Sequence, residues 1–326
     1  MINGKKLNVS ISPHLRSSVT TRSIMLDVII ALCPALIASG VIFGLRALVL
    51  TAVSVAACVI FEYAFRKFSH RSNTIGDLSA VVTGILIAFN CPSSIPFWMV
   101  IVGDAFAILI AKQCFGGIGQ NFVNPAIAGR IFMLLSFKQM TQWTQPGAGF
   151  MNLAGVQAIT GATPLAASAE ELPSLWEMFI GMRGGCLGET CIAALLIGFI
   201  YLLIKKVISP VIPCFYIGTV AVIMLIYGKG DLTFTAYQLL SGGLVLGAVF
   251  MATDYTTSPI SRKGKIIYAI GCGLLTSLIR LFGSLPEGVS YSIILMNIFT
   301  PLIERFTTPK PFGTPKKEKK QKEAEA

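Results

Sequence analysis

The feature that most constrains this chain is a series of long apolar runs separated by short polar segments. Several runs reach roughly 18–20 residues, the length that a helix needs to cross the hydrocarbon core of a bilayer. Only 13% of the residues are charged and 54% are hydrophobic, whereas a soluble domain carries about 25% charged residues. The pattern therefore predicts an all-α polytopic membrane protein.

The apolar runs predict about ten transmembrane helices. Their expected ranges are 24–44, 47–65, 78–95, 97–113, 124–140, 187–204, 211–228, 237–253, 266–283 and 289–304. The polar start of the chain has no short apolar region with its own cleavage site, so we expect no removable signal peptide. We expect a cytoplasmic N-terminal segment (1–23), a first transmembrane half (24–140), an extracytoplasmic loop (141–186), a second transmembrane half (187–305) and a basic cytoplasmic tail (306–326).

Basic residues indicate the orientation of these helices. If the N-terminus lies inside and the helices alternate, five of the 26 lysines and arginines fall outside: Arg46, Lys138, Arg183, Lys229 and Arg280. Lysine and arginine concentrate on the cytoplasmic side of membrane proteins, so we expect both termini there and the protein in the cell (inner) membrane. The net charge of +11 then reflects topology and contact with membrane lipids, and we expect no nucleic-acid partner.

Two short sequence echoes indicate an internal repeat. Leu78-Ser79 opens one apolar run and Leu240-Ser241 opens another, and both runs end in polar helix-breaking residues. Segments 112–116 and 279–283 both close on Phe-Gly. Two halves of five helices each are inverted relative to one another, an arrangement that commonly places a site at the midplane between broken helices. We therefore expect two inverted five-helix repeats.

The glycine- and asparagine-rich segment 116–126 lies between two expected spans. Its glycines let the backbone approach a ligand closely, and Asn121 and Asn124 offer paired hydrogen-bond donors and acceptors. A ring-shaped cofactor such as a flavin fits these groups. An asparagine-capped turn between two helices explains the same residues, and both interpretations stay open.

Acidic residues within the apolar runs are candidates for an ion pathway, because an ionisable group at membrane depth is costly and is usually functional. Asp104 is best placed to lie inside the membrane, followed by Asp254 and Glu189. The remaining acidic residues in or beside spans are expected at interfaces, where the cost is small: Asp27, Glu62, Asp77 and Glu287.

Metal or hydrolytic chemistry is not indicated by the sequence. The eight cysteines form no Cys-x-x-Cys pair and lie mostly within apolar runs, so we interpret them as small buried hydrophobic residues and expect no metal site. His14 and His70 are isolated in basic segments. No catalytic Ser/His/Asp set, phosphate-binding lysine loop or HExxH motif is present.

The long polar interval contains Thr160-Gly161-Ala162-Thr163-Pro164. Gly161 permits a tight turn, and Pro164 fixes its own φ and biases Thr163 toward an extended conformation. The result is a threonine hydroxyl in an exposed and locally rigid loop. Taken alone, this pattern is simply a loop.

Together these motifs resemble the D subunits of the ion-translocating Rnf electron-transport complexes, and they are similar to the B subunit of the sodium-pumping NADH:quinone oxidoreductase. The resemblance covers nearly the whole chain. It rests on Ser12-Pro13-His14, Val82-Thr83-Gly84, Ala111-Lys112, Gly116–Asn121, Asn124–Ala126, Thr160–Leu165, Gly188–Thr190, Phe250–Asp254, Thr257–Pro259 and Pro286–Val289.

The resemblance implies a covalent flavin. In that family the last threonine of a Ser/Thr-Gly-Ala-Thr motif carries FMN through a phosphoester bond made by a flavin transferase, which corresponds to Thr163, with Thr160, Gly161 and Ala162 completing the motif. The family often has an acidic residue three positions before the first Ser/Thr, where this chain has Gln157. This departure is expected to weaken the attachment of FMN.

The resemblance also implies a multisubunit enzyme. Electrons pass between ferredoxin and NAD through several subunits, including a second flavin subunit, while Na⁺ or H⁺ crosses the membrane. A second, non-covalent flavin (riboflavin) is expected. No family motif assigns its pocket, and we place it at Asn121, Asn124 and Asp254 from the polar and acidic residues noted above. Two other functions remain: a flavin-free secondary transporter, which explains broken helices, and a structural membrane anchor. Thr163→Ala separates them, because only the redox function depends on it.

Overall fold

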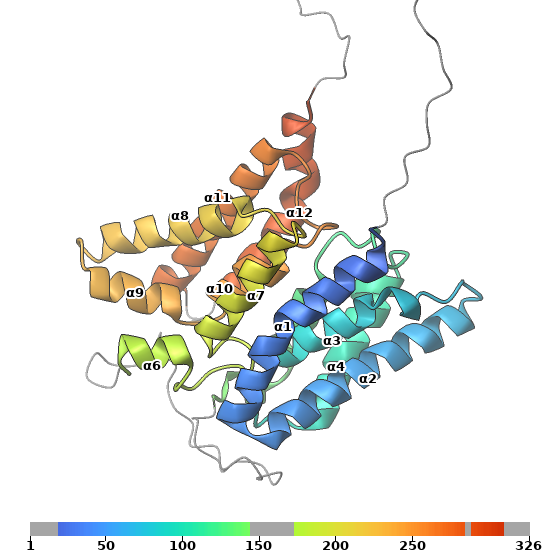
Figure 1. Ribbon diagram of the computed structural model, residues 1–326. Helices are drawn as coiled ribbons and strands as arrows, with labels where there is room; N and C mark the ends of the chain where they lie inside the picture. The colour runs from blue at the N-terminus through green and yellow to red at the C-terminus, as the bar shows by residue number, and fades with distance from the viewer. Residues whose placement is uncertain (1–18, 144–172, 284–287, 310–326) are drawn as a thin grey trace, which may run out of the picture.

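The computed structural model describes residues 19–143, 173–283 and 288–309, and every regular element in these ranges is a helix. The helices form two groups, with the N-terminal half on the right of Figure 1 and the C-terminal half on the left. The end at which the first helix begins is called the upper end below, as in Figure 1, and the opposite end is the lower end. The structure is thus a bundle of two joined helical halves.

The N-terminal half contains five α-helices. Thr20 and Ser23 form a reciprocal cap at the start of the first helix, and Gly44, with φ of 81°, lets the chain reverse into the second. The elements are α1 (Thr21–Phe43), α2 (Leu45–Phe68), the 3₁₀ turn η1 (Ile75–Asp77), α3 (Ser79–Phe89), α4 (Phe97–Ala105), the π-helix η2 (Phe106–Gln113), α5 (Pro125–Ser136) and the 3₁₀ turn η3 (Lys138–Thr141).

The C-terminal half is built from helices of more varied length. Asp231 caps α9, and hydrogen bonds from the amides of Phe234 and Thr233 lower the pKa of its carboxyl group. The elements are α6 (Leu175–Ile180), α7 (Ile192–Ile204), α8 (Val211–Tyr227), α9 (Leu232–Leu240), α10 (Leu244–Leu246), the π-helix η5 (Gly247–Met251), α11 (Arg262–Phe282) and α12 (Val289–Thr307).

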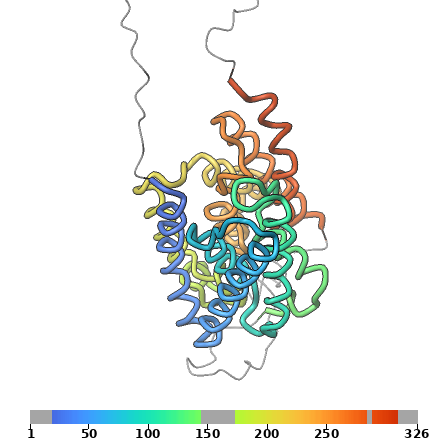
Figure 2. The backbone as a smooth tube through the Cα atoms, turned by 90° about the vertical axis from the view of Figure 1, so that its right-hand side faces the viewer, coloured from blue at the N-terminus to red at the C-terminus, as the bar shows by residue number. Residues whose placement is uncertain are grey.

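The two halves meet along two pairs of helices. Helix α1 packs along α7, and α5 packs against α12. Within the halves, α2 covers α3 and α8 covers α11. The tube in Figure 2, turned from the first view, shows the helices running side by side through the depth of the molecule. The interior therefore lies between helices of both halves.

Three helices, α1, α2 and α11, are long and apolar enough to span a membrane, and α9 with α10 and η5 makes a fourth if the bent pair is one span. Helices α3, α5, α7 and α8 are also apolar but shorter, with 10–17 residues each. The expectation of helices throughout both halves is therefore confirmed, and the chain is a polytopic membrane protein. These helix lengths do not establish the predicted number of ten complete spans.

Two of the expected spans are interrupted. The run 78–95 is helical only to Phe89 in α3, because Pro92 follows within three residues and lacks the amide that would continue the ladder. The run 237–253 bends by 63° between α9 and α10, where Gly242 has a φ of 64°. The sequence patterns located both runs correctly but not the breaks inside them.

The lower end is held by arginines that donate to backbone carbonyls at these breaks. The Arg46 guanidinium donates to the Ser93 carbonyl at 2.7 Å, just after α3 ends. Arg280 donates to the Ser241 carbonyl at 3.1 Å, at the bend after α9, and Arg183 donates to the Glu189 carbonyl at 2.9 Å. Carbonyls at the C-terminal end of a helix have no intrahelical donor, so Arg280 satisfies the Ser241 carbonyl at the end of α9, whereas Arg46 and Arg183 satisfy carbonyls of the non-helical segments after α3 and before α7. Three of the five basic residues expected outside thus have structural partners.

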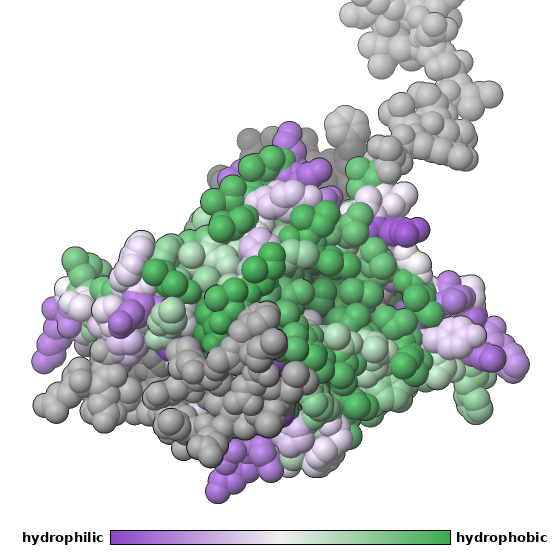
Figure 3. Space-filling model, turned by 60° about the horizontal axis from the view of Figure 1, so that its bottom comes forward, coloured by the Kyte–Doolittle hydropathy of each residue, from purple (hydrophilic) through white to green (hydrophobic). Residues whose placement is uncertain are grey.

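The surface is largely apolar along the helices. Figure 3 shows hydrophobic side chains over the middle of the visible face and hydrophilic ones toward its margins. Val41, Leu135 and Ile226 are each more than 70% exposed. A soluble protein rarely exposes a large contiguous apolar surface, so this surface fits contact with lipid.

Candidate functional site

A cavity of about 380 Å³ opens between the two halves near the upper end. Side chains of α1, α3 and η2 form one side of it, and those of α7, η5 and the segment 253–256 form the other. The segment 118–126 closes it between them. The cavity therefore joins both asparagines of the glycine-rich segment with the residues that follow η5.

Asn121 and Asn124 both line this cavity and are almost fully buried. The Asn124 side chain accepts from the amide of Ala126, capping α5, and its Nδ2 donates to the Met251 carbonyl at 3.2 Å. The Asn121 Nδ2 donates to the Thr256 hydroxyl at 3.1 Å. The capping interpretation is therefore correct for Asn124, and both amides also link the two halves.

Asp254 lies at the opposite wall of the cavity and is partly buried. Its carboxylate accepts hydrogen bonds from the hydroxyls of Thr256 at 3.0 Å and Thr257 at 3.3 Å. The expected grouping of Asn121, Asn124 and Asp254 around one pocket is therefore present in the structure.

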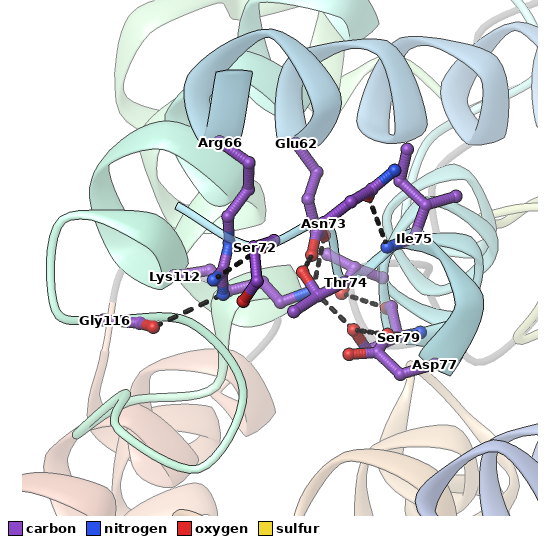
Figure 4. Close-up of polar contacts among 11 residues, drawn as sticks. Glu62, Arg66, Ser72, Asn73, Thr74, Ile75, Asp77, Ser79, Lys112 and Gly116 are labelled. Atoms are coloured by element: carbon purple, nitrogen blue, oxygen red, sulfur yellow. Dashed lines mark hydrogen bonds and ion pairs between the residues drawn. The ribbon is translucent and has the colours of Figure 1, made fainter. Parts of the chain in front are cut away.

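A buried ion pair forms the wall of the cavity beside α3. The Lys112 Nζ lies 2.7 Å from the Glu62 Oε2 and donates to the Ser79 hydroxyl at 2.6 Å. The second carboxylate oxygen of Glu62 accepts from the Thr74 hydroxyl at 2.7 Å. Figure 4 shows Glu62 projecting from α2 toward Thr74 and Lys112. Because Ser79 and Lys112 also line the cavity, a cationic group faces it.

The cavity suits an organic ring of moderate size. Ligand pockets of roughly 300–1,000 Å³ are typically apolar with a few placed polar groups, and here Val82, Leu86 and Phe250 supply apolar walls beside the amides, the ammonium and the carboxylate. A flavin ring has one apolar edge and one edge of alternating donors and acceptors. The residues present therefore fit this group.

The other two acidic candidates lie outside this cavity, apart from each other. The Asp104 carboxyl group on α4 accepts from or donates to the Ser54 hydroxyl at 2.8 Å. The Glu189 carboxylate accepts from the Cys186 amide at 3.0 Å, near the lower end. The structure does not join Asp104, Glu189 and Asp254 into one site.

The residues of the attachment motif, Thr160, Gly161, Ala162 and Thr163, lie outside the described residues, as does Glu287. Their predicted roles therefore stay predictions. The cysteines are free thiols; Cys58, Cys91, Cys186 and Cys272 are buried, whereas Cys33, Cys114 and Cys214 are exposed. The interpretation of cysteines as buried residues is thus wrong for those three, which face outward from the helices. Among the described residues, no three His, Cys, Asp or Glu side chains gather as metal ligands.

Sequence reasoning missed the ion pair of Glu62 and Lys112, because it placed Glu62 at an interface. A signal was present: Ser54, Cys58, Glu62 and Arg66 recur every fourth residue, which places them on one face of α2. All four are buried. Arg130, expected on the inner side, instead lies in the core and donates to Asn90.

The fold is that of a multi-pass helical membrane protein, and a cavity lies between its two halves. The chain belongs to the NQR2, RnfD, RnfE family, whose model matches residues 8–313, and the resemblance carried by its motifs is thereby confirmed.

Several relatives match over nearly their full length. The chain is 48% identical over 327 residues to the D subunit of the Na(+)-translocating ferredoxin:NAD(+) oxidoreductase complex of Acetobacterium woodii, covering 98% of this chain and 100% of the relative. It is 42% identical to the D subunit of the proton-translocating ferredoxin:NAD(+) oxidoreductase complex of Clostridium ljungdahlii, covering 94% and 96%. The D subunit of the ion-translocating oxidoreductase complex of Escherichia coli is 33% identical, covering 94% and 98%.

Proposed function

We propose that this chain is the D-type membrane subunit of an ion-translocating ferredoxin:NAD oxidoreductase complex and that it carries flavin. The observation that carries the proposal is the cavity: it unites Asn121, Asn124 and Asp254, three polar residues proposed for one pocket from the sequence, in a space of about 380 Å³. The full-length similarity to D subunits of such complexes supports the same role. The chain then acts with other subunits, including a second flavin subunit.

The cavity would hold a non-covalent flavin such as riboflavin, and a bound flavin supplies electron-transfer chemistry that no side chain provides. Asn121 and Asn124 would orient the polar edge of the ring, and their contacts across the two halves keep them in place. Lys112, held by Glu62 and Ser79, presents positive charge at the wall. Charge beside a flavin ring tunes its electronics, so this ammonium would favour electron uptake.

A covalent FMN on Thr163 is the second part of the proposal. The intact Thr160–Pro164 motif supports it, with a flavin transferase as the modifying partner. The chain's position in the cell membrane, with both termini cytoplasmic and this motif outside, follows from the distribution of lysine and arginine.

Ten spans in two inverted repeats form the proposed membrane architecture. The pairing of α1 with α7 and of α5 with α12 supports it, because equivalent helices meet across the boundary between halves. A second support comes from the two sequence echoes. Lys112 donates to Ser79 at the start of α3, and Arg280 donates to Ser241 at the start of the matching run.

The test is a flavin inventory of the purified complex, co-expressed with its flavin transferase. Acid precipitation separates flavin bound covalently to the polypeptide from flavin released into solution. Thr163→Ala abolishes the FMN adduct on its own peptide, measured by mass spectrometry, while Thr144→Ala, in the same interval, retains it. An unmodified Thr163 in the wild-type complex contradicts the covalent part of the proposal.

The released fraction tests the cavity independently. Asn121→Ala lowers the riboflavin released per complex, whereas Gln120→Ala, an exposed neighbour, leaves it unchanged. Equal riboflavin in both variants excludes this cavity as the site. A wild-type complex that contains neither flavin favours the two alternative functions, a flavin-free transporter or a structural anchor.

A further inference from the structure

Asp104 lies in the middle of the helical bundle with 0% of its surface exposed. It projects from α4 toward α2 and α3, where the Ser54 hydroxyl lies 2.8 Å from its Oδ1. The same hydroxyl lies 2.9 Å from the Gly84 carbonyl oxygen of α3. Three oxygens from three helices therefore meet at one point.

The number of protons available for these two contacts decides whether Asp104 is a neutral acid or a carboxylate. A serine hydroxyl has one proton and donates to one acceptor. If Asp104 is a carboxylate, Ser54 donates either to it or to Gly84, and the other short oxygen–oxygen contact has no proton in it. If Asp104 is a neutral acid, its O–H donates to Ser54, and Ser54 donates to Gly84. Only the neutral form fills both contacts.

The surroundings of Asp104 offer no compensating charge. The buried Lys112 ammonium pairs with Glu62, and the Asp104 Oδ2 has no hydrogen-bond partner among the described residues. The titratable groups that face Asp104 are two buried thiols: Cys58 on α2, which hydrogen-bonds to the carboxyl group, and Cys91 after α3. An isolated buried carboxylate is so costly that the group neutralises instead.

We infer that Asp104 is a proton-binding site, held as a neutral carboxylic acid by the relay from its hydroxyl to Ser54 and on to the Gly84 carbonyl. The buried face of α2 continues from Ser54 through Cys58 to Glu62, which gives the site a polar connection to the upper end of the bundle. Its ligand is a proton rather than a metal cation, because oxygens of different groups that share a cation stand farther apart than the 2.8 and 2.9 Å between the Ser54 oxygen and its two neighbours.

Infrared spectroscopy of the purified complex in detergent tests this inference directly. The spectrum of the wild type minus that of Asp104→Asn shows the carbonyl stretching band of a protonated acid at neutral pH, and the band shifts in D₂O. Ser54→Ala moves the same band, because the acid loses its hydrogen-bond acceptor. Asp231→Asn is the control and leaves the acid band unchanged, because Asp231 is exposed and caps α9, a position that asparagine also caps.

Two results overturn the inference. One is the absence of an acid band in the difference spectrum; the other is an acid band that appears only when Na⁺ is removed, which would make Asp104 a sodium ligand. If Asp104→Asn does not assemble, Asp104→Glu and Ser54→Ala replace it, and identical acid bands in these variants and the wild type also overturn it. Flavin content is measured in the same samples. A complex without flavin then contradicts the proposed function, whereas the acid band tests the protonation of Asp104 independently.

Discussion

Glu62 and Asp104 are two buried carboxyl groups on one seam of the bundle, where α2 packs against α4 and η2. Glu62 is matched by the Lys112 ammonium at 2.7 Å and by the Thr74 hydroxyl. Asp104 faces a hydroxyl and thiols. Ser54, the partner of Asp104, and Glu62 are eight positions apart, which corresponds to about 12 Å along α2. Two buried carboxyl groups along the same helix are therefore neutralised in different ways.

The difference teaches how this fold accommodates acidic groups away from water. Near the upper end the Lys112 ammonium supplies an opposite charge beside the Glu62 carboxylate. Deeper in the bundle no cation is supplied, and a bound proton removes the charge. The pair of Glu62 and Lys112 stabilises the local structure, because hydrogen bonds to Thr74 and Ser79 also hold its two partners. The Asp104 carboxyl group has one oxygen without a partner among the described residues and a proton that a change in local charge is able to displace.

The largest expected effect comes from breaking the ion pair. Lys112→Met leaves the Glu62 carboxylate buried without its cation, and removal of one partner of a buried pair costs about 3–5 kcal/mol. We expect a large fall in the thermal unfolding midpoint of the complex in detergent. A loss of unfolding free energy below about 1 kcal/mol, within the range of a surface pair, would show that Lys112 does not stabilise the buried Glu62 carboxylate.

A double replacement sharpens this result. Glu62→Gln combined with Lys112→Met removes both charges, and replacing a buried pair by neutral residues is often close to neutral for stability. We expect the double variant to recover most of the midpoint lost in Lys112→Met. The measurement is a double-mutant cycle by thermal unfolding; simple addition of the two single losses contradicts a direct pairing.

The same pair of carboxyl groups shows what the sequence revealed and what it did not. Length and hydropathy predicted the helical membrane fold, and Asp104 was identified as buried from its position in an apolar run. Glu62 and Lys112 are 50 residues apart, and no local pattern states that two helices will bring them together. Asn121, Asn124 and Asp254 were proposed for one pocket from their residue types and positions in the sequence, and only the structure shows the cavity that they share.

Helix breaks were the hardest feature to predict. Hydropathy averages over a window, so a run that bends at Gly242 or stops before Pro92 reads as one span. The stabilising partners of such breaks are remote: Arg46 reaches the carbonyls after α3, and Arg280 reaches those after α9. The sequence offered one signal, since Arg46 and Arg280 depart from the positive-inside distribution that we expect for this chain.

A smaller effect is expected at Ser54. Ser54→Ala removes the hydroxyl that joins Asp104 to Gly84, and the loss of a buried hydrogen-bond partner costs about 1–3 kcal/mol. We expect a moderate decrease in the unfolding midpoint, less than that of Lys112→Met. Thr51→Val is the control, because it removes a buried hydroxyl of α2 that donates to the Ala47 carbonyl of the same helix. An equal decrease in both variants would remove the special role of the hydroxyl.

The smallest effect is expected at Asp104 itself, and it separates the two ways of neutralising a carboxyl group most clearly. Asn has nearly the shape of a neutral acid, and its Nδ2 is able to donate to Ser54 in place of the acid O–H. If Asp104 is protonated, Asp104→Asn changes stability by less than about 1 kcal/mol, because one neutral hydrogen bond replaces another. If Asp104 were an unpaired carboxylate, the substitution would remove a buried charge and raise the midpoint by several degrees. Glu62→Gln, measured alongside, strands the Lys112 ammonium and costs about 3–5 kcal/mol. The two substitutions have the same chemistry, so their different outcomes measure directly whether a proton or a lysine neutralises each carboxyl group.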